Sequence, residues 1–236
     1  MKTAIILAGG LGTRLQPFTQ IMPKPLLPIG ERSVLEIQIE RLKKFGFTKI
    51  FFATNYKADY IARFFGDGSQ LGVELHYSKE EEPLGTVGPL SLIREELTKP
   101  FVVMNGDILS LVNYEKLYEH ALKSNCDLTV AIKKYVMPFA FGDILFENDR
   151  VIGIEEKPDI IKYILAGIYV MKPQVLDYVP NKKYFGMDTL IKTMIAKNDP
   201  IAKFELTDYW LDIGQIDDFQ QANETYAEYF KVDTAS

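Results

Sequence analysis

The chain has 236 residues, 47% of them hydrophobic and 25% charged, with a formal net charge of −5. This is the composition of a globular protein with one sizeable core. It contains no Lys/Arg cluster of the kind that binds nucleic acid and no apolar run near the roughly 20 residues that span a bilayer. The N-terminus shows no signal-peptide pattern, and Cys126, the single cysteine, cannot form an internal disulfide. We therefore expect a cytoplasmic protein whose partners are neither nucleic acids nor membranes.

The first half of the chain alternates apolar segments of strand length with amphipathic segments of helical period. Ser33 and Glu36 form a capping-box pattern at the start of the first long helix, and Gly46 supplies its stop signal. This β-α-β-α order predicts an α/β fold with a Rossmann-like, mostly parallel sheet flanked by helices. The predicted strands cover residues 3–7, 49–55, 73–77, 101–104 and 128–132, and the predicted helices lie near 35–45, 60–65, 87–97 and 114–124.

The pattern changes near residue 137, where short strands replace the alternation. Residues 142–146 and 151–154 are predicted to pair antiparallel around an Asn148-Asp149 turn. No repeat, low-complexity tract or linker divides the chain, so we expect a single domain. Its expected parts are a domain over 1–231, with a first half over about 1–135 and an elaborated second half over about 136–231, and a frayed tail at 232–236. Further strands are predicted at 164–171 and 209–212, and helices near 174–178, 187–196 and 216–230.

A glycine-rich turn follows the first predicted strand. Gly9, Gly10 and Gly12 let backbone amides approach a ligand without a Cβ in the way, and successive amides in such a turn form an anion-binding concavity. Arg14 follows at once, and Lys24 lies between two prolines ten residues later. The stretch therefore predicts a polyphosphate site. A turn that needs its glycines only for a tight corner is the structural alternative.

Two better-known phosphate loops do not fit this stretch. A Walker A loop has Lys-Ser or Lys-Thr directly after its last glycine, whereas Gly12 is followed by Thr13 and Arg14. A dinucleotide fingerprint has a third glycine three residues after the second, and that position is Leu15. The turn is therefore expected to bind phosphate in a different way.

Two carboxylates lie at the ends of predicted strands. Asp107 closes the Asn105-Gly106-Asp107 turn after the strand at 101–104, and Asp212 ends the strand at 209–212. Ligands of parallel sheets bind beyond the carboxyl ends of the strands, so we expect residues 105–107 and the glycine-rich turn to line one crevice. Two aspartates reaching that crevice would form a pair suited to Mg²⁺. A turn residue at Asp107 and a helix cap at Asp212 are the alternatives.

Other polar residues give weaker signals. Lys157 follows two glutamates, and residues 80–82 are three glutamates in a row. Such charge runs are more often solvated surfaces than binding sites. Gly85 and Thr86 at the start of a predicted helix could offer a backbone and a hydroxyl contact to a nucleobase. The two histidines and the single cysteine are far apart in sequence, which gives no support to a zinc site.

Seven segments together resemble the sugar nucleotidyltransferases, also called NDP-sugar pyrophosphorylases. They occur in the family's order across nearly the whole chain, which makes the resemblance specific. The segment PLGT is most similar to that of mannose- and heptose-1-phosphate guanylyltransferases, so GTP with a manno-configured hexose or heptose 1-phosphate is the expected pair, while UTP, dTTP and CTP stay open. The matching segments are LAGGLGTRLQPFT with PKPLLP (7–28), EPLGT (82–86), NGD (105–107), FGDI (141–144), EEKP (155–158), AGIYV (166–170) and YWLDIG (209–214).

The resemblance implies that an oxygen of a sugar 1-phosphate attacks the α-phosphorus of a nucleoside triphosphate, giving an NDP-sugar and pyrophosphate. It implies catalytic roles for Arg14, Lys24 and Asp107, and a Mg²⁺ ion held by Asp107 and Asp212. The implied sugar-phosphate-binding residues are Gly142, Glu156, Lys157 and Gly167. The implied nucleotide-binding residues are Leu7, Ala8, Gly9, Gly10, Gly12, Thr13, Glu80 or Glu82, Gly85, Thr86, Asn105 and Gly106.

The chain departs from several family members because no hexapeptide-repeat β-helix follows the closing helix. Acetyltransferase activity and trimerisation through that domain are therefore not expected. The expected partners are a nucleoside triphosphate and a sugar 1-phosphate, and the oligomeric state stays open, a homodimer included. Two alternatives remain: an enzyme of the same fold acting on a non-sugar phosphate, and a non-catalytic relative that senses an NDP-sugar and regulates a partner. The presence of Arg14, Lys24 and both aspartates argues against the second.

Overall fold

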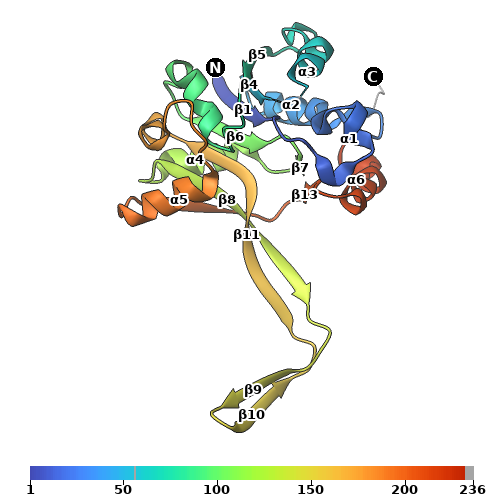
Figure 1. Cartoon of the computed structure of the whole chain (residues 1–236), viewed down its shortest axis with the longest axis vertical. Coiled ribbons are helices and arrows are strands. Elements are labelled where there is room, and N and C mark those ends of the chain that lie inside the picture. The colour runs from blue at the N-terminus through green and yellow to red at the C-terminus, as the bar shows by residue number, and fades with distance from the viewer. Residues whose placement is uncertain (56, 232–236) are drawn as a thin grey trace.

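A computed structural model describes residues 1–55 and 57–231, so the predicted tail at 232–236 lies outside the described residues. The molecule has two parts of very different shape (Figure 1): a compact body, and a narrow β-arm that projects far from it. Within the described residues, no helix is both long enough and apolar enough to cross a membrane.

The body is built on a seven-stranded sheet with the order β12-β8-β11-β6-β1-β4-β5. β1, β4, β5 and β6 pair in parallel, as do β8 and β12, whereas β11 runs antiparallel to both of its neighbours. The predicted α/β fold with a mostly parallel sheet is confirmed. The strands are β1 (Lys2–Leu7), β4 (Phe47–Thr54), β5 (Glu74–Lys79), β6 (Phe101–Asn105), β8 (Leu128–Pro138), β11 (Asp159–Met171) and β12 (Ile201–Leu206).

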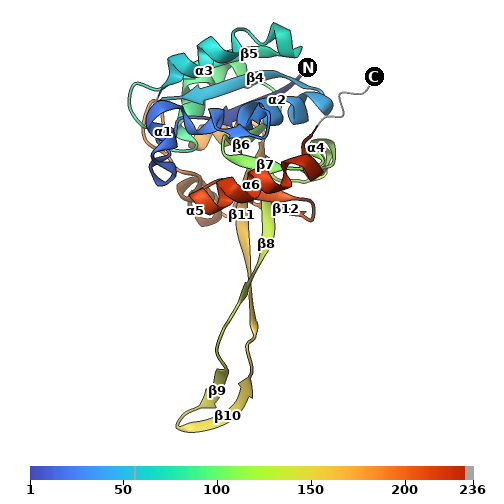
Figure 2. The ribbon, with the colours of Figure 1, turned by 90° about the vertical axis from the view of Figure 1, so that its right-hand side faces the viewer.

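Helices cover both faces of this sheet (Figure 2). Successive strand residues point to opposite faces, so Ala4 and Ile6 pack against one helical layer and Ile5 against the other. The first layer consists of α2 (Val34–Lys44), α3 (Ala58–Phe65) and α4 (Tyr114–Lys123). The second consists of α5 (Met187–Ala196) with two 3-10 helices, Gly88–Glu96 and Pro173–Tyr178.

A third apolar cluster lies around the closing helix α6 (Ile216–Tyr229). It joins this helix to the segment after β1 and to two small antiparallel sheets. One sheet pairs β7 (Ile108–Ser110) with β13 (Trp210–Asp212), and the other pairs β2 (Pro28–Ile29) with β3 (Arg32–Ser33). The remaining elements are α1 (Phe18–Ile21) and the 3-10 helices Thr13–Leu15, Lys24–Leu26 and Ser69–Leu71.

Local signals in the sequence explain several helix boundaries. The side chain of Ser33 accepts a hydrogen bond from the Glu36 amide, and Glu36 accepts one from the Ser33 amide, so the predicted capping box at the start of α2 is confirmed. Gly46 follows this helix with φ +80° and Gly66 follows α3 with φ +55°, a region that favours glycine. The predicted helix at 87–97 is instead a 3-10 helix, with a non-helical residue at Ile93.

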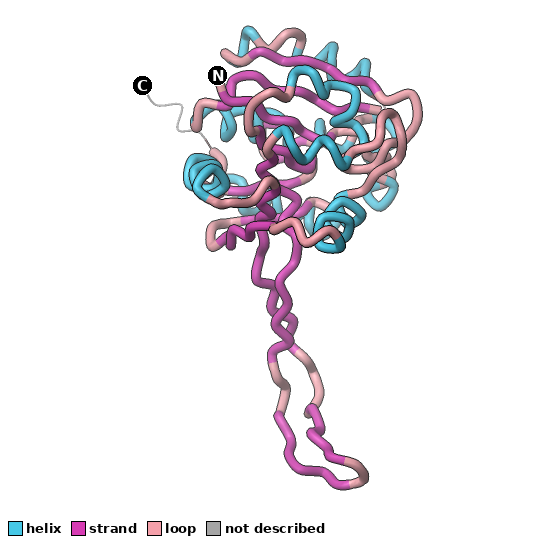
Figure 3. Tube along the Cα trace, turned by 90° about the vertical axis from the view of Figure 1, so that its left-hand side faces the viewer, coloured by secondary structure: helices cyan, strands magenta, loops and turns pink. Residues whose placement is uncertain are grey.

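The arm consists of the outer parts of β8 and β11 and a terminal hairpin (Figure 3). β8 and β11 stay paired out to Pro138 and Asp159, well beyond the predicted strands. The hairpin pairs β9 (Asp143–Glu147) with β10 (Arg150–Glu155) around the predicted Asn148-Asp149 turn. All residues of β9 are exposed and its side chains pack on no helix.

Candidate active site

The carboxyl ends of β1 and β6 meet at one edge of the sheet. Leu7 pairs with Asn105 in the parallel register, and the Gly106 amide donates to the Leu7 carbonyl at 2.9 Å. A Cβ on Gly106 would lie 2.8 Å from that carbonyl oxygen, which explains why glycine is needed at this position. The expectation that the glycine-rich turn and residues 105–107 line one crevice is confirmed.

A cavity of about 420 Å³ opens at this edge, within the range of small-molecule sites. It brings together segments that follow β1, β4, β5 and β6 and the 3-10 helix Pro173–Tyr178. Among the residues expected to bind nucleotide, it is lined by Leu7, Gly9, Gly10, Glu80, Gly85, Thr86 and Asn105, together with Asp107. Ala8 is buried beside it, and its amide donates to the Ala53 carbonyl at 2.8 Å.

The three glycines of the turn have different surroundings. Gly10 is exposed, and a Cβ there would meet nothing within 4 Å, so its backbone is open to a ligand. A Cβ on Gly9 would lie 3.0 Å from Oε1 of Glu80. Gly12 has φ +63°, and its Cβ would lie 2.8 Å from Cγ2 of Thr19 and 3.1 Å from Cβ of Lys24. Gly12 thus allows the turn to pack directly against the segment that carries Lys24.

Lys24 forms an ion pair with Asp107, which lines the cavity. Nζ of Lys24 lies 2.5 Å from Oδ2 of Asp107, and the two side chains are 11% and 26% exposed. Lys24, which lies between two prolines, is the first residue of a short 3-10 helix. Asp107 lies in the turn after β6. The structure therefore joins two residues that are 83 positions apart in the sequence.

Asp212 is brought to Asp107 by the pairing of β13 with β7. Asp212 lies opposite Ile108, and the Ile213 amide donates to the Asp107 carbonyl at 3.0 Å. Partial burial of the Asp212 carboxyl group, and then the negative charge of Asp107, raise its pKa to about 6. Nearby positive charge from Lys24 acts in the opposite direction. Repulsion between two carboxylates is what a bound cation would relieve.

The donor set fits Mg²⁺. Oδ1 of Asp107 is buried and has no hydrogen-bond partner in the described residues, so it is available to a cation. Mg²⁺ prefers oxygen ligands and is commonly held by one or two carboxylates plus substrate phosphates. In residues 1–55 and 57–231 no group of three or more His, Cys, Asp or Glu side chains is arranged to hold a metal by itself.

Arg14 and Thr13 lie at the exposed side of the same region, in the 3-10 helix after the turn. The Arg14 guanidinium lies 3.6 Å from the position that a Cβ on Gly214 would occupy, just beyond Asp212. Its positive charge also acts to lower the pKa of Asp212. Arg14 is thus within electrostatic range of the aspartate pair.

The segment at residues 80–86 also lines the cavity. Glu80 is buried, and its Oε2 accepts a hydrogen bond from the Leu84 amide at 2.8 Å. Burial raises the pKa of Glu80, and this hydrogen bond partly offsets the rise. Glu82 is exposed and lines a different hollow, so the structure puts Glu80 at the cavity and Glu82 away from it. The Thr86 hydroxyl accepts from the Met187 amide at 2.7 Å, which leaves its own proton free to be donated.

The four residues expected to bind the sugar phosphate are divided between the two parts of the molecule. Gly167 is buried at an irregularity in β11, with φ +67°, and a Cβ there would lie 2.8 Å from Nδ2 of Asn105. Gly142, Glu156 and Lys157 all lie on the β-arm. A Cβ on Gly142 would lie 3.2 Å from Oε2 of Glu156, so the first two are close neighbours there.

Several lining residues are absent from the sequence-based prediction. Asn55 follows β4, the strand beside β1, so the rule that ligands bind beyond strand ends could have found it. Tyr184 comes from the segment before α5, and no local pattern marks it. The others are Leu11, Ala53, Pro83 and Pro89.

The fold and this crevice define an α/β protein with a candidate ligand site at the carboxyl ends of its parallel strands. Residues 3–229 match the family model described as nucleotidyl transferase, and the chain belongs to that family. It is 34% identical over 224 residues to a mannose-1-phosphate guanyltransferase beta-B of Xenopus laevis, covering 92% of this chain and 62% of that protein. It is also 34% identical over 223 residues to a mannose-1-phosphate guanylyltransferase catalytic subunit beta of Drosophila melanogaster, with 92% and 60% covered. The chain thus spans about three fifths of the length of these relatives.

The comparison with solved structures gives matches that extend over the whole length of the solved chain. HddC from Yersinia pseudotuberculosis superposes with a TM-score of 0.75 at 30% identity, covering 96% of this chain and 100% of that one. The same protein complexed with GMP-PN gives a TM-score of 0.74 at 29% identity. The family resemblance seen in the sequence is therefore confirmed by sequence and by fold.

Proposed function

We propose that the protein is a sugar-1-phosphate nucleotidyltransferase. In this reaction an oxygen of the sugar 1-phosphate forms a bond to the α-phosphorus of a nucleoside triphosphate, and the bond to the bridging oxygen of pyrophosphate breaks. The observation that carries the proposal is the meeting of Lys24, Asp107 and Asp212 beside an open glycine-rich turn. A single crevice then contains both positive charge for phosphate and carboxylates for a cation.

Each residue has a task that its position supports. The exposed amides around Gly10 would bind the phosphate chain, and Arg14 would draw off the charge of the departing pyrophosphate. Lys24 would polarise the α-phosphate. Two anionic reactants must be held in line, and positive groups must stabilise the charge that spreads over the phosphorus oxygens. No covalent nucleophile is needed.

The residues suited to hold Mg²⁺ are Asp107 and Asp212. When bound, the cation would neutralise phosphate charge and help to orient the triphosphate. Lys24 pairs with Asp107 in the structure. We expect Lys24 to shift its contact toward phosphate when substrate and cation enter together, because the carboxylate then gains a second positive partner.

For the substrates, we propose GTP and a manno-configured hexose or heptose 1-phosphate. The names of the curated relatives support this pair, and the structure of HddC with GMP-PN supports a guanine nucleotide in this fold. The cavity adds a chemical argument. Guanine presents ring N–H and exocyclic NH₂ donors, and the buried Glu80 carboxylate lines the cavity as an acceptor.

The test is a pyrophosphate-release screen of GTP, UTP, dTTP and CTP against a panel of sugar 1-phosphates with Mg²⁺. We expect turnover with GTP and mannose 1-phosphate or a related heptose 1-phosphate. Turnover only with another nucleotide would keep the chemistry and overturn the choice of base. Turnover with a phosphorylated alcohol or amine in place of the sugar would overturn the choice of acceptor.

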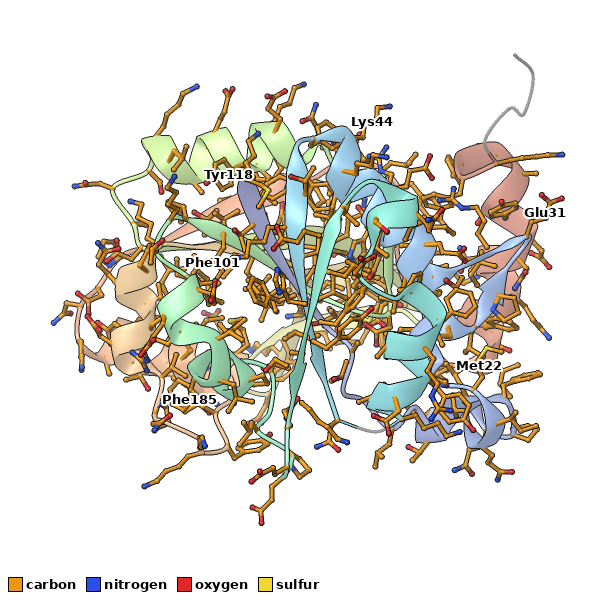
Figure 4. All side chains as sticks on the ribbon, turned by 90° about the horizontal axis from the view of Figure 1, so that it is seen from above. Met22, Glu31, Lys44, Phe101, Tyr118 and Phe185 are labelled. Carbon is orange, nitrogen blue, oxygen red and sulfur yellow. The ribbon has the colours of Figure 1, made fainter. Side chains whose placement is uncertain are left out.

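The screen also separates catalysis from sensing. A folded protein that binds an NDP-sugar by calorimetry but releases no pyrophosphate with any pair would favour the regulatory alternative. A folded protein that does neither would overturn both. The Lys44→Ala variant is a suitable control, because this exposed lysine lies at the end of α2, at the edge of the body (Figure 4).

A further inference from the structure

The β-arm exposes a large amount of apolar surface. Of the 24 large apolar side chains that are exposed in the described residues, 13 lie between residues 135 and 165. An isolated two-stranded ribbon is marginally stable at best in water, and exposed apolar patches of this kind mark interaction sites. At about 3.3 Å per residue, the extended chain would carry the arm tip roughly 45 Å from the body. Figures 1 and 2 show no part of the body folded against it.

The arm also carries residues that the crevice lacks. Gly167 lies next to Asn105 in the crevice, whereas Gly142, Glu156 and Lys157 lie on the arm. If these four residues bind one sugar phosphate, as the proposed function requires, one chain in this conformation cannot bring them together. The crevice of the body is therefore incomplete by itself.

We propose that the arm docks onto a second copy of the chain and completes that copy's sugar-phosphate site. In a two-fold dimer each arm would cross to the partner's body and bring Gly142, Glu156 and Lys157 to the partner's crevice. This is a domain swap, in which identical elements are exchanged between protomers. Two hybrid sites result, each made from one body and the other chain's arm.

Size and complementarity favour a second copy over an unrelated partner. The arm from residue 135 to 163 contains 29 residues, comparable to the 20 to 30 residues that a standard interface contributes on each side. The residues on the arm and those in the body belong to one set of sugar-phosphate positions. A second copy of this chain has the same crevice, with Gly167 in place but without Gly142, Glu156 and Lys157. The arm of the first copy carries these three residues.

The first test is the mass in solution. We expect light scattering to give about 54 kDa, twice the 26.9 kDa of one chain. Two matched double variants locate the interface. Phe146→Glu with Ile152→Glu alters side chains on the arm that are 72% and 65% exposed, and Phe64→Glu with Ile195→Glu alters side chains on the body that are 58% and 61% exposed.

The arm variant should be monomeric at concentrations where the body variant remains dimeric. Circular dichroism should show that both variants fold, because all four side chains are exposed. A monomeric wild-type protein would overturn the proposal. Dimerisation that the arm variant retains and the body variant loses would overturn it as well.

The second test locates the arm without relying on activity. A photo-crosslinker is attached to Lys157→Cys in a Cys126→Ser background, and subunits labelled with ¹⁴N and ¹⁵N are mixed by co-refolding. We expect crosslinks from position 157 to crevice peptides that contain Asn105 or Gly167. About half of these should join differently labelled chains, as random pairing predicts. Crosslinks to the crevice of the same chain only would mean that the arm folds back, and crosslinks to another surface would mean that it docks elsewhere; either overturns the proposal.

The third test uses activity. Asp107→Asn and Lys157→Ala, each of which we expect to be inactive alone, are mixed by the same co-refolding. Crossed arms predict recovery of about one quarter of the wild-type rate, because half of the dimers are mixed and each has one intact hybrid site. Recovery below a few per cent, with both variants dimeric, would overturn the trans arrangement. If the wild type releases no pyrophosphate, the proposed function fails, and the mass and the crosslinks still decide where the arm lies.

Discussion

At the scale of single residues, the pair of Lys24 and Asp107 is the most informative contact. Its two members come from the segment after the glycine-rich turn and from the turn after β6, and their side chains are largely enclosed. A lysine and a carboxylate this close hold one another in position. Both groups then lie where the phosphates and a cation are expected.

Removing either member should affect the reaction strongly. We expect Lys24→Ala and Asp107→Asn each to lower kcat/KM by at least about 10²-fold, a loss of roughly 2.7 kcal/mol in transition-state stabilisation. Steady-state pyrophosphate release measures this, with Lys44→Ala expected to retain the wild-type rate. A folded variant with a near-normal rate would contradict the role given to its residue.

Asp212 should make the stability of the metal-free protein depend on pH. Its pKa in the folded state is about 6, above the ordinary value of 3.8 for an aspartate, so the folded state binds the proton more tightly than the unfolded state. Its contribution to stability is therefore complete below about pH 4 and is lost as the pH rises through 6. Asp212→Asn does not titrate, so its unfolding free energy relative to wild type should increase from pH 4 to pH 7. Urea unfolding in EDTA measures this, and an equal difference at both pH values would contradict the assignment.

Gly12 and Gly46 form a matched pair for testing the turn. Both have positive φ, +63° and +80°, but only at Gly12 would a Cβ meet neighbours, on Thr19 and Lys24. Because alanine disfavours a positive φ, replacing either glycine by alanine should lower the free energy of unfolding by about 1–2 kcal/mol. Only Gly12→Ala should also lower kcat/KM, by at least about 10-fold, because its Cβ displaces the segment that carries Lys24. Equal activities in two equally destabilised variants would show that the contact does not position Lys24.

At the scale of secondary-structure elements, helix α2 supports the turn that carries Asp107. The Gln38 side chain is 2% exposed, and its Nε2 donates to the carbonyl of Asn105 at 3.0 Å and to that of Ile108 at 2.7 Å. These two hydrogen bonds hold both sides of the turn that contains Asp107. The helix therefore contributes to the position of a carboxylate that it does not itself carry.

Gln38→Met should destabilise the protein and weaken the site together. The substitution keeps the approximate volume but leaves two buried carbonyl groups without a donor, at a cost of about 2 kcal/mol. Gln221→Met, on the exposed side of α6, should change the unfolding free energy by less than about 0.5 kcal/mol. Urea unfolding with a pyrophosphate assay tests this prediction. Full activity in Gln38→Met would show that the turn keeps its shape without the helix.

Much of the fold was predictable from local pattern. Buried strands such as β1 and β6 are continuous apolar runs between turn signals, and the capping box at Ser33 marked the start of α2. The meeting of the two strand-end turns followed from the general geometry of parallel sheets. These features depend on residues close together in sequence or on a rule of topology.

Other features left no such signal. Residues 133–138 and 159–163 extend β8 and β11 into the arm, where both faces are largely exposed, so no alternation of apolar and polar residues appears. β12 is a half-exposed edge strand and was missed, as was the three-residue β7. Their positions depend on long-range pairing. The family resemblance groups Gly167 with Gly142, Glu156 and Lys157, and no local pattern indicated that the first lies in the body and the other three on the arm.

At the scale of the whole molecule, the net charge of −5 contrasts with the chemistry of the crevice. A nucleoside triphosphate would add further negative charge, so under the proposed function its binding would depend on local cations and on Mg²⁺. We therefore expect nucleotide and Mg²⁺ to stabilise the folded chain only when both are present.

Thermal unfolding measures this coupling. At a GTP–Mg²⁺ concentration of 100 times the dissociation constant, the folded state should gain about 2.7 kcal/mol. For a chain of this size that corresponds to a rise in Tm of roughly 5–10 °C. EDTA should remove most of the rise, and mannitol in place of GTP should produce none. A rise of equal size in EDTA would show that the metal is not needed for nucleotide binding.

The pairing of β13 with β7 also has a consequence for biosynthesis. The glycine-rich turn lies at residues 9–12, Asp107 near the middle of the chain, and Asp212 near the end of the matched region, which runs from residue 3 to 229. Chains are made from the N-terminus, and early segments begin to fold first. A ribosome-bound chain that has emerged only through β6 has its phosphate turn but not its second carboxylate. Under the proposed function, nucleotide can therefore stabilise the chain fully only after the segment that carries Asp212 has been synthesised.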